Sequence, residues 1–286
     1  MRIDLHTHSD ASDGTDSPAR LVANARVAKL DVVALTDHDT VAGHPAAVAA
    51  VRDDPGTREI ALVRGAEFSC LLNGVSLHLL GYLFDPAHAE LAREMALLRT
   101  DRTRRAQAMV AKLVELGAPI DWERVSRIAG GAAVGRPHVA RALVEVGLVP
   151  DVAAAFSDEW IGDGGRAYVE KYSLAPQRAI ELVKAAGGVT VFAHPGAAKR
   201  GEIVDESAIE AFAAAGLDGI EIDHPDHDHA TRVRLRDLAS GLRLLVTGSS
   251  DYHGFVKSTP IGAETTDPAV FEELISRATG AQVVRG

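Results

Sequence analysis

The chain has 286 residues, 47% of them hydrophobic and 24% charged, a composition that allows a sizeable core and excludes a low-complexity or disordered chain. The formal net charge of −10 argues against a broad basic surface for duplex DNA, although bound divalent cations would still allow a nucleotide substrate. No apolar run reaches the length of about 20 residues that a membrane span needs. Because the single cysteine, Cys70, cannot form an internal disulfide, we expect a cytoplasmic protein without a membrane partner.

Short apolar runs alternate with longer, alanine-rich amphipathic stretches, and this pattern predicts an α/β protein. The expected strands are residues 3–5, 32–35, 60–63, 189–192, 219–222 and 244–246. The expected helices are residues 18–30, 176–186, 205–215 and 230–240. The Asn73-Gly74 pair predicts a hairpin between strands at residues 67–72 and 75–83.

The middle of the chain has a different pattern. From about residue 91 to 165 the helical pattern is almost unbroken and no strand is predicted. This stretch contains an arginine-rich run, Arg99, Arg102, Arg104 and Arg105. We therefore predict a barrel-like α/β domain formed by residues 1–98 and 173–286, with a helical insertion at residues 99–172.

Histidine and acidic residues gather where the predicted strands end. His6 and His8 are two residues apart, so on a strand their side chains point to one face and can reach one ion. Other residues of this kind near strand ends are Asp10, Asp13, His38, Glu67, His78, His194, Asp223, His224, Asp251 and His253. Active sites lie at the carboxyl ends of strands in barrels and open α/β sheets. Because histidine and carboxylate ligands suit zinc, manganese and iron, so many candidates imply two or three ions.

The remaining residues of these types are expected to have other roles. His44, His88, His227 and His229 lack the placement at a strand end, and we expect them on the solvated surface. Asp37 and Asp39 flank His38, and we expect them to orient its ring or a metal-bound water.

Together these motifs resemble the PHP (polymerase and histidinol phosphatase) family of phosphoesterases. The matching segments stand in the family order: Asp4-Leu5-His6-Thr7-His8-Ser9, Thr36-Asp37-His38-Asp39, Gly65-Ala66-Glu67-Phe68-Ser69, His78, Ala193-His194-Pro195 and Gly248-Ser249-Ser250-Asp251-Tyr252-His253. The resemblance implies a distorted (β/α)7 barrel and a trinuclear metal site in which Glu67 bridges two ions. The implied ligands are His6, His8, Asp13, His38, Glu67, His78, His194, Asp251 and His253, and of these Glu67, His194 and Asp251 are also assigned to catalysis.

The predicted insertion carries a further resemblance. Gly135-Arg136-Pro137-His138 is similar to a segment of one subgroup, the nucleoside 3′,5′-bisphosphate phosphatases and the 5′→3′ exoribonucleases of short RNA. This implies that the insertion caps the active site and that Arg136, His138 and His224 contact substrate. Arg136 offers a planar fork that can hold a phosphate by two hydrogen bonds. The alternative is a helix start at Pro137 from which Arg136 and His138 face solvent.

The resemblance implies a metal-dependent hydrolase of phosphate esters. The expected reaction removes the 3′-phosphate of a nucleoside 3′,5′-bisphosphate and extends to short 5′-phosphorylated RNA, with Mn²⁺ favoured over Zn²⁺ or Fe²⁺ as the ion. The first alternative is a phosphatase of a small metabolite such as histidinol phosphate, but Arg136 suggests that a second phosphate is held. The second alternative is a polymerase-accessory domain that binds metal without catalysis. The oligomeric state stays open.

Overall fold

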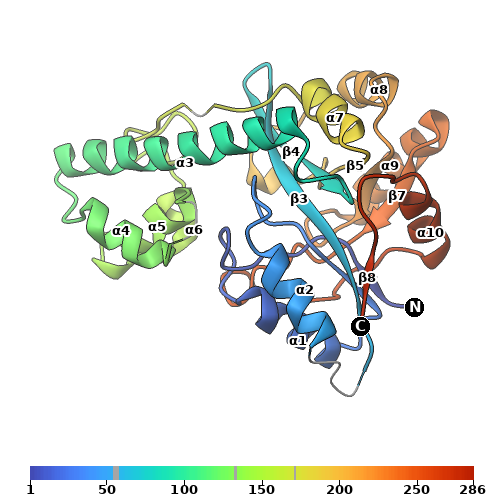
Figure 1. Cartoon of the computed structure of the whole chain (residues 1–286). Helices are drawn as coiled ribbons and strands as arrows, with labels where there is room; N and C mark the ends of the chain where they lie inside the picture. The colour runs from blue at the N-terminus through green and yellow to red at the C-terminus, as the bar shows by residue number, and fades with distance from the viewer. Residues whose placement is uncertain (54–57, 132–133, 171) are drawn as a thin grey trace.

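The computed structural model describes residues 1–53, 58–131, 134–170 and 172–286. Residues 132, 133 and 171 of the expected insertion therefore lie outside the described part. A barrel-shaped sheet with helices around it forms the larger body, and a group of helices projects from one side (Figure 1). In the described part of the chain, no helix combines the length and the apolar character that crossing a membrane requires.

The sheet has the strand order β1-β2-β3-β4-β5-β6-β7, and β8 pairs with β3. The strands are β1 (Ile3–Asp4), β2 (Val32–Leu35), β3 (Ala61–Leu72), β4 (Val75–Tyr82), β5 (Val189–Phe192), β6 (Gly219–Asp223), β7 (Leu245–Gly248) and β8 (Val284–Arg285). β4 is antiparallel to β3 and β5, whereas the other neighbours along the path are parallel. Beyond the ends of β1 and β7, Thr7 and Tyr252 form a parallel bridge, so the sheet is nearly closed, as the expected (β/α)7 barrel requires.

The strand β3 differs from its expected form. We predicted separate strands at residues 60–63 and 67–72, but β3 runs through both without a break. Its first half pairs with β2 and its second half with β4. A side chain at Gly65 would place its Cβ 2.6 Å from the Gly81 carbonyl oxygen, so glycine is what allows β4 to approach here. The Asn73-Gly74 hairpin is confirmed, with φ of +50° and +88° at the two turn residues, as a type I′ turn requires.

The four helices expected around the barrel are confirmed within a few residues. They are α1 (Pro18–Val27), α7 (Pro176–Ala185), α8 (Glu206–Ala214) and α9 (His229–Leu242). α1 ends three residues early because Lys29 adopts a left-handed conformation, with φ of +59°. The sequence analysis missed α2 (His44–Arg52), α10 (Pro268–Ser276), the short 3-10 turn Ala198–Arg200 and β8. α2 and α10 each have a proline in the first turn, Pro45 and Pro268, and a proline at this position is a helix-start signal that the sequence contains.

The projecting helices have a hydrophobic core of their own. They are α3 (Ala89–Glu115), α4 (Trp122–Ala129), α5 (Arg136–Glu145) and α6 (Val152–Ala155). α3 crosses the expected boundary at residue 99 without a break: Leu91, Met95 and Leu98 pack in the barrel core, and its second half packs in the separate core. We call the second half of α3, the helices α4 to α6 and the following residues up to 170 the lobe. After α6 the described residues form turns, so this part is less helical than expected.

The lobe core should be a sensitive site for stability. Leu113 is fully buried there, and Leu113→Ala should lower the free energy of unfolding by about 2–5 kcal/mol, because the change removes buried apolar surface and leaves a cavity. Urea unfolding followed by tryptophan fluorescence measures the effect in the lobe, since both tryptophans, Trp122 and Trp160, pack against this core. Leu97 on the same helix is 42% exposed, so Leu97→Ala is the control and should change the value by less than about 0.5 kcal/mol. Equal losses would contradict this account of the core.

Candidate metal centre

Glu67 lies in the middle of β3 and is surrounded by imidazole rings. Its side chain is only 1% exposed. Five histidine ring nitrogens lie 2.9–3.2 Å from its carboxylate oxygens; they belong to His6, His8, His38, His78 and His194. These histidines follow β1, β2 and β5 or lie within β4, so widely separated parts of the chain meet at one carboxylate.

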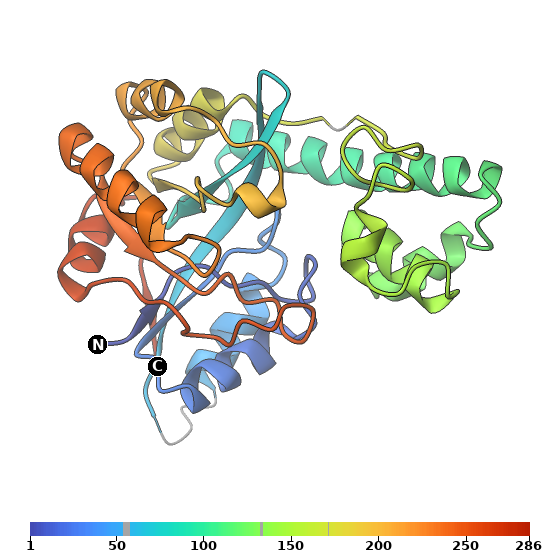
Figure 2. The ribbon, with the colours of Figure 1, turned by 180° about the vertical axis from the view of Figure 1, so that it is seen from behind.

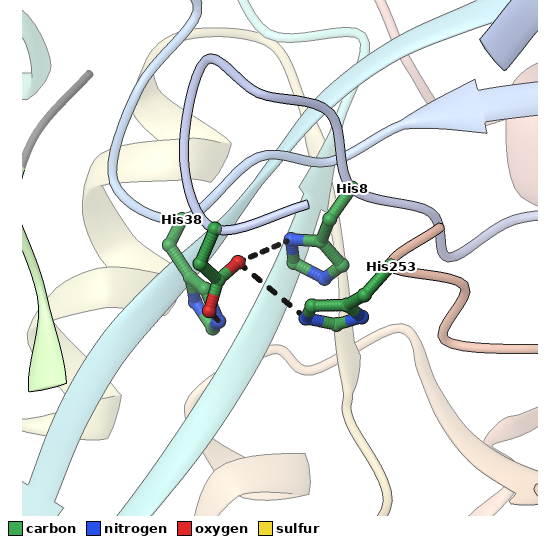
Figure 3. Close-up of side chains that lie close together, drawn as sticks. His8, His38 and His253 are labelled. Carbon is green, nitrogen blue, oxygen red and sulfur yellow. Dashed lines mark ion pairs between the residues drawn. The ribbon is translucent and has the colours of Figure 1, made fainter. Parts of the chain in front are cut away.

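Two further carboxylates complete the group. The Asp13 Oδ1 atom lies 3.4 Å from His253 Nε2 and 3.8 Å from His8 Nδ1. Figure 3 shows the labelled rings of His8, His38 and His253 gathered in this part of the site. The Asp251 Oδ1 atom lies 3.4 Å from the Nε2 atom of His8. All nine residues expected as ligands therefore lie in one site.

The ligand-type atoms form three overlapping groups, each with atoms within 4.8 Å of one another. The groups are His8, Asp13, His38 and His253; His6, His8 and Asp251; and His38, Glu67 and His78. Across the described residues, buried ring nitrogens of His6, His8, His38 and His78 lack a hydrogen-bond partner although carboxylate oxygens are near. Buried polar atoms are normally hydrogen-bonded, so nitrogens and oxygens that point to common positions fit divalent ions as their shared partners.

The charge states of the groups support the same fit. Burial raises the pKa of Glu67, but the imidazoles of His38, His78 and His6 outweigh it and hold the pKa well below its usual value. Burial lowers the pKa of His8, but the nearby carboxylates of Asp251 and Glu67 outweigh it and raise this pKa to about 9. Burial and the neighbouring His8 lower the pKa of His253 to about 3. The rings of His8 and His253 stack with their centroids 4.1 Å apart, so a proton on one disfavours a proton on the other. Divalent cations would neutralise the carboxylates without adding protons to these rings.

Glu221 is a functional residue that the sequence analysis missed. It is fully buried in β6, its Oε1 atom lies 3.1 Å from His6 Nδ1, and its Oε2 atom accepts a hydrogen bond from the backbone N of His194 at 2.9 Å. The carboxylate turns the other nitrogen of His6 toward Glu67 and holds His194 in place. The available signal in the sequence is the carboxylate of Glu221 between two isoleucines of an apolar strand. This position lies within the strand and not at its end, where the other candidates were expected.

The hydrogen bonds of Asp37 and Asp39 lead to segments other than the His38 ring, and their expected role toward a metal-bound water stays a prediction. Asp37 accepts hydrogen bonds from the backbone N of Ser9 at 2.8 Å, from its hydroxyl at 2.7 Å and from the Ser12 hydroxyl at 2.7 Å. It therefore fixes the loop that carries Asp13. Asp37 does not contact the His38 ring, because adjacent residues after a strand point in different directions.

Asp39 connects the barrel to the helix α3. It accepts hydrogen bonds from the backbone N of Ser69 at 2.8 Å and from the Nε atom of Arg102 at 2.6 Å. The Nη2 atom of Arg102 also donates to the Ser69 hydroxyl at 2.7 Å. Arg102 appeared in the sequence only as part of an arginine run, and its contact over 63 residues of chain could not be inferred from that run.

Arg136 lies in the same cavity as the metal-ligand residues. The cavity has a volume of about 250 Å³, and its polar lining includes Asp13, His38, His78, His194, Arg102 and Arg136. The Nη1 atom of Arg136 lies 2.6 Å from Asp163 Oδ1. The guanidinium also covers the ring of Phe156, with 5.3 Å to the ring centroid. Its cation is thus held at the cavity wall by an acidic residue and an aromatic ring.

The other two residues expected to contact substrate are buried. The Nδ1 atom of His138 accepts a hydrogen bond from the backbone N of Gly135 at 3.0 Å, at the start of α5. His138 lines a groove next to the metal centre and is not part of the lining of the cavity that holds Arg136. His224 lies at the metal centre, with its Nε2 atom 3.5 Å from Asp251 Oδ2.

Two of the four histidines expected on the surface are buried. The Nε2 atom of His44 lies 2.8 Å from the Gly65 carbonyl oxygen. The Nε2 atom of His227 accepts a hydrogen bond from the backbone N of Gly196 at 3.0 Å. His229 is exposed, as expected, and His88 is partly exposed and caps α3. The expectation was wrong for His44 and His227 because each bonds to a backbone group of another segment.

A barrel with histidine and carboxylate side chains gathered at one end is typical of metal-dependent hydrolases, and comparison with known proteins identifies the family. The PHP domain matches residues 4–117. A 5′-3′ exoribonuclease of Haemophilus influenzae is 34% identical over 258 residues, 88% of this chain and 90% of the relative. A 3′,5′-nucleoside bisphosphate phosphatase of Chromobacterium violaceum is 32% identical over 88% of this chain and 87% of the relative.

A solved structure agrees with this placement. A Bifidobacterium adolescentis protein described as a metal-dependent phosphoesterase superposes with a TM-score of 0.91 at 34% identity, over 97% of this chain and 96% of that one. The chain belongs to the PHP family, and it is a metal-dependent phosphoric ester hydrolase.

The buried His44 gives the protein a measurable pH dependence. Burial lowers the pKa of His44 to about 4, whereas in the unfolded chain it is about 6.5. The unfolded chain therefore binds more protons between these values, and stability is lost as the pH falls through this window. His44→Gln should reduce the loss of unfolding free energy between pH 7 and pH 5 by about 2 kcal/mol. Urea unfolding at both pH values measures it, and the exposed His229 provides the control, since His229→Gln should leave the pH dependence unchanged. An unchanged pH dependence in His44→Gln would contradict the argument.

Proposed function

We propose that this enzyme hydrolyses the 3′-phosphate of nucleoside 3′,5′-bisphosphates and extends this reaction to short 5′-phosphorylated RNA. The observation that carries the proposal is the position of Arg136, whose guanidinium lines the same cavity as His38 and His194. A substrate with two phosphates could place one at the metal centre and the other at this fork. The names of the exoribonuclease and bisphosphate phosphatase relatives agree with such a substrate.

The proposed metal site holds three divalent ions, with Mn²⁺ as the activating ion. The ligands would be the nine gathered residues, with Glu67 between two ions, and the mixture of nitrogen and oxygen atoms suits manganese. Bound divalent ions supply a Lewis acid and lower the pKa of water. Glu67, His194 and Asp251 would carry this chemistry. We also predict a cytoplasmic location.

The chain's own residues would position the substrate around this centre. Arg136 would leave Asp163 and bind the phosphate that is not cleaved, so its action is mainly on binding. Arg102 faces the same cavity from α3 and adds positive charge beside the scissile phosphate. We propose that His224 and His138 contact the substrate at the edges of the site, and that residues 99–172 act as an insertion that caps it.

A substrate panel tests the proposed function. Phosphate release should be measured with the Mn²⁺-loaded enzyme on adenosine 3′,5′-bisphosphate, adenosine 3′-phosphate, adenosine 5′-phosphate and histidinol phosphate. The bisphosphate should have the highest kcat/KM, because only it engages both Arg136 and the metal centre. A histidinol phosphate value equal to or above it would favour the small-metabolite alternative.

Glu67 should be indispensable for metal binding. Glu67→Gln removes the negative charge with little change of shape, so the protein should lose bound metal and more activity than the roughly 10–100-fold that an outer partner of a metal ligand contributes. Metal content by mass spectrometry and phosphate release measure both effects. Glu206→Gln, at an exposed position on α8, is the control and should keep both. Normal metal content with substantial turnover in Glu67→Gln would refute the bridging role.

Arg136 should decide the preference for two phosphates. Removing one partner of a charged pair costs about 2–5 kcal/mol, and each 1.4 kcal/mol is roughly tenfold in kcat/KM. Arg136→Ala should therefore lose most of its efficiency on the 3′,5′-bisphosphate and much less on the 3′-monophosphate. Arg124→Ala is the matched control, since Arg124 also pairs with an acidic residue of the lobe, Glu145, but does not line the cavity. Equal losses on the two substrates would show that Arg136 acts at the scissile phosphate.

A further inference from the structure

A second concavity lies between the lobe and the barrel, beside the metal centre. Its volume is about 520 Å³, within the range of small-molecule sites. The lobe contributes Arg141 of α5, the first half of α3 contributes Arg99, and the barrel contributes Thr15 and Phe255 from the loops after β1 and β7. Figure 2 shows α5 facing these two loops. We call this concavity the outer groove.

The outer groove adjoins the proposed reaction site. Asp13 lines the cavity at the candidate metal centre, and Thr15 of the same loop lines the outer groove. The Thr15 hydroxyl accepts a hydrogen bond from the backbone N of Phe255 at 3.1 Å and lies 3.5 Å from the His253 carbonyl oxygen. Between them, Gly254 has φ of +71°, and a Cβ there would lie 2.0 Å from the Thr15 hydroxyl. This tight contact fixes Phe255 two residues from a ligand-type histidine.

The side chains of the outer groove suit a single-stranded nucleic acid. Within the described residues, neither Arg99 nor Arg141 makes an ion pair, unlike Arg102 and Arg136. Phe255 is 82% exposed, so its ring is accessible to a base that stacks on it. Unpaired cations that follow a backbone, together with an exposed ring on which a base can stack, are the features of single-strand binding sites. Asp10 also lines the outer groove, and the two arginines outweigh its negative charge.

We propose that the outer groove holds the second nucleotide of a short RNA whose first nucleotide occupies the cavity with Arg136. This proposal rests on the proposed function and selects the chain substrate within it. In both substrates the water oxygen bonds to phosphorus, the bond from phosphorus to the 3′ oxygen breaks, and that oxygen takes a proton. The substrates differ only in that RNA carries the next nucleoside on another oxygen of the same phosphate, and the outer groove provides the space and the charge for it.

Binding and turnover together test the proposal. A fluorescent 5′-phosphorylated RNA tetranucleotide with phosphorothioate linkages, added to the Mn²⁺-loaded enzyme, gives Kd by anisotropy. Arg141→Ala and Phe255→Leu should each raise Kd by about fivefold or more, because a phosphate contact or a stacked base is lost. Phe255→Trp should restore tight binding, since it keeps a stacking face. On unmodified RNA, the loss of kcat/KM in both variants should exceed the loss on the 3′,5′-bisphosphate by at least about fivefold.

Two control variants match the tested positions. Arg93 matches the tested Arg141 as an arginine on a helix, but it lies exposed on α3, outside the outer groove. Val27 on α1 is 82% exposed, the same fraction as Phe255. Arg93→Ala and Val27→Ala should leave Kd within about twofold of the wild type.

The outcomes separate this proposal from the proposed function. Bisphosphate hydrolysis without tetranucleotide binding, or with binding that neither variant weakens, overturns the outer groove and leaves the proposed function in place. Weakened binding in both variants without bisphosphate hydrolysis by the wild type supports the groove and overturns the proposed function. Equal losses on RNA and bisphosphate in both variants indicate damage to the centre at His253 and overturn the groove.

Discussion

The structure depends on one buried carboxylate, that of Glu67, and on the imidazole rings around it. A charge taken out of water is costly unless it is paired, so this residue can exist only where several partners converge. The fold provides this position by running β3 continuously through the barrel wall, with β2 on one side and β4 on the other. The antiparallel β4 places His78 opposite Ser69, two residues from Glu67 on the same face. The reversed direction of β4 is therefore part of how the centre is assembled.

Further buried carboxylates hold the candidate ligand residues in position by hydrogen bonds. Asp4 accepts hydrogen bonds from the backbone N atoms of Ser250 at 3.1 Å and Gly262 at 2.8 Å, which holds the segment before Asp251. Asp251 and His194 have φ of +51° and +32°, conformations that cost energy outside glycine and persist only where the surroundings impose them. Asp4 and Glu221 impose them here. These two carboxylates thus hold basic rings and strained loops in position.

The strand-end placement of His6, His38 and Asp251 could be predicted because the carboxyl ends of parallel strands meet at one edge of a barrel. That argument uses only local pattern and a general rule of topology. The burial of His44 could not be predicted in this way, since its partner is the carbonyl oxygen of Gly65, which reaches it only after β3 has taken its place. Glu221 was missed for a related reason: a carboxylate inside an apolar strand is meaningful only once the opposite wall of the barrel presents His6 to it.

The helix α3 connects the lobe to the barrel and lines both concavities. Its first turns are fixed in the barrel core, and the buried Asp39 holds Arg102 one turn further along. Arg99 and Arg102 are three residues apart, so they lie on one side of the helix, yet one lines the outer groove and the other lines the cavity with Arg136. The spacing between the two concavities is therefore set by one helical turn rather than by a flexible loop. If both concavities hold nucleotides, the spacing of Arg99 and Arg102 on α3 sets the distance between the two neighbouring phosphates. The ion pair between Asp39 and Arg102 fixes the position of Arg102 relative to the barrel.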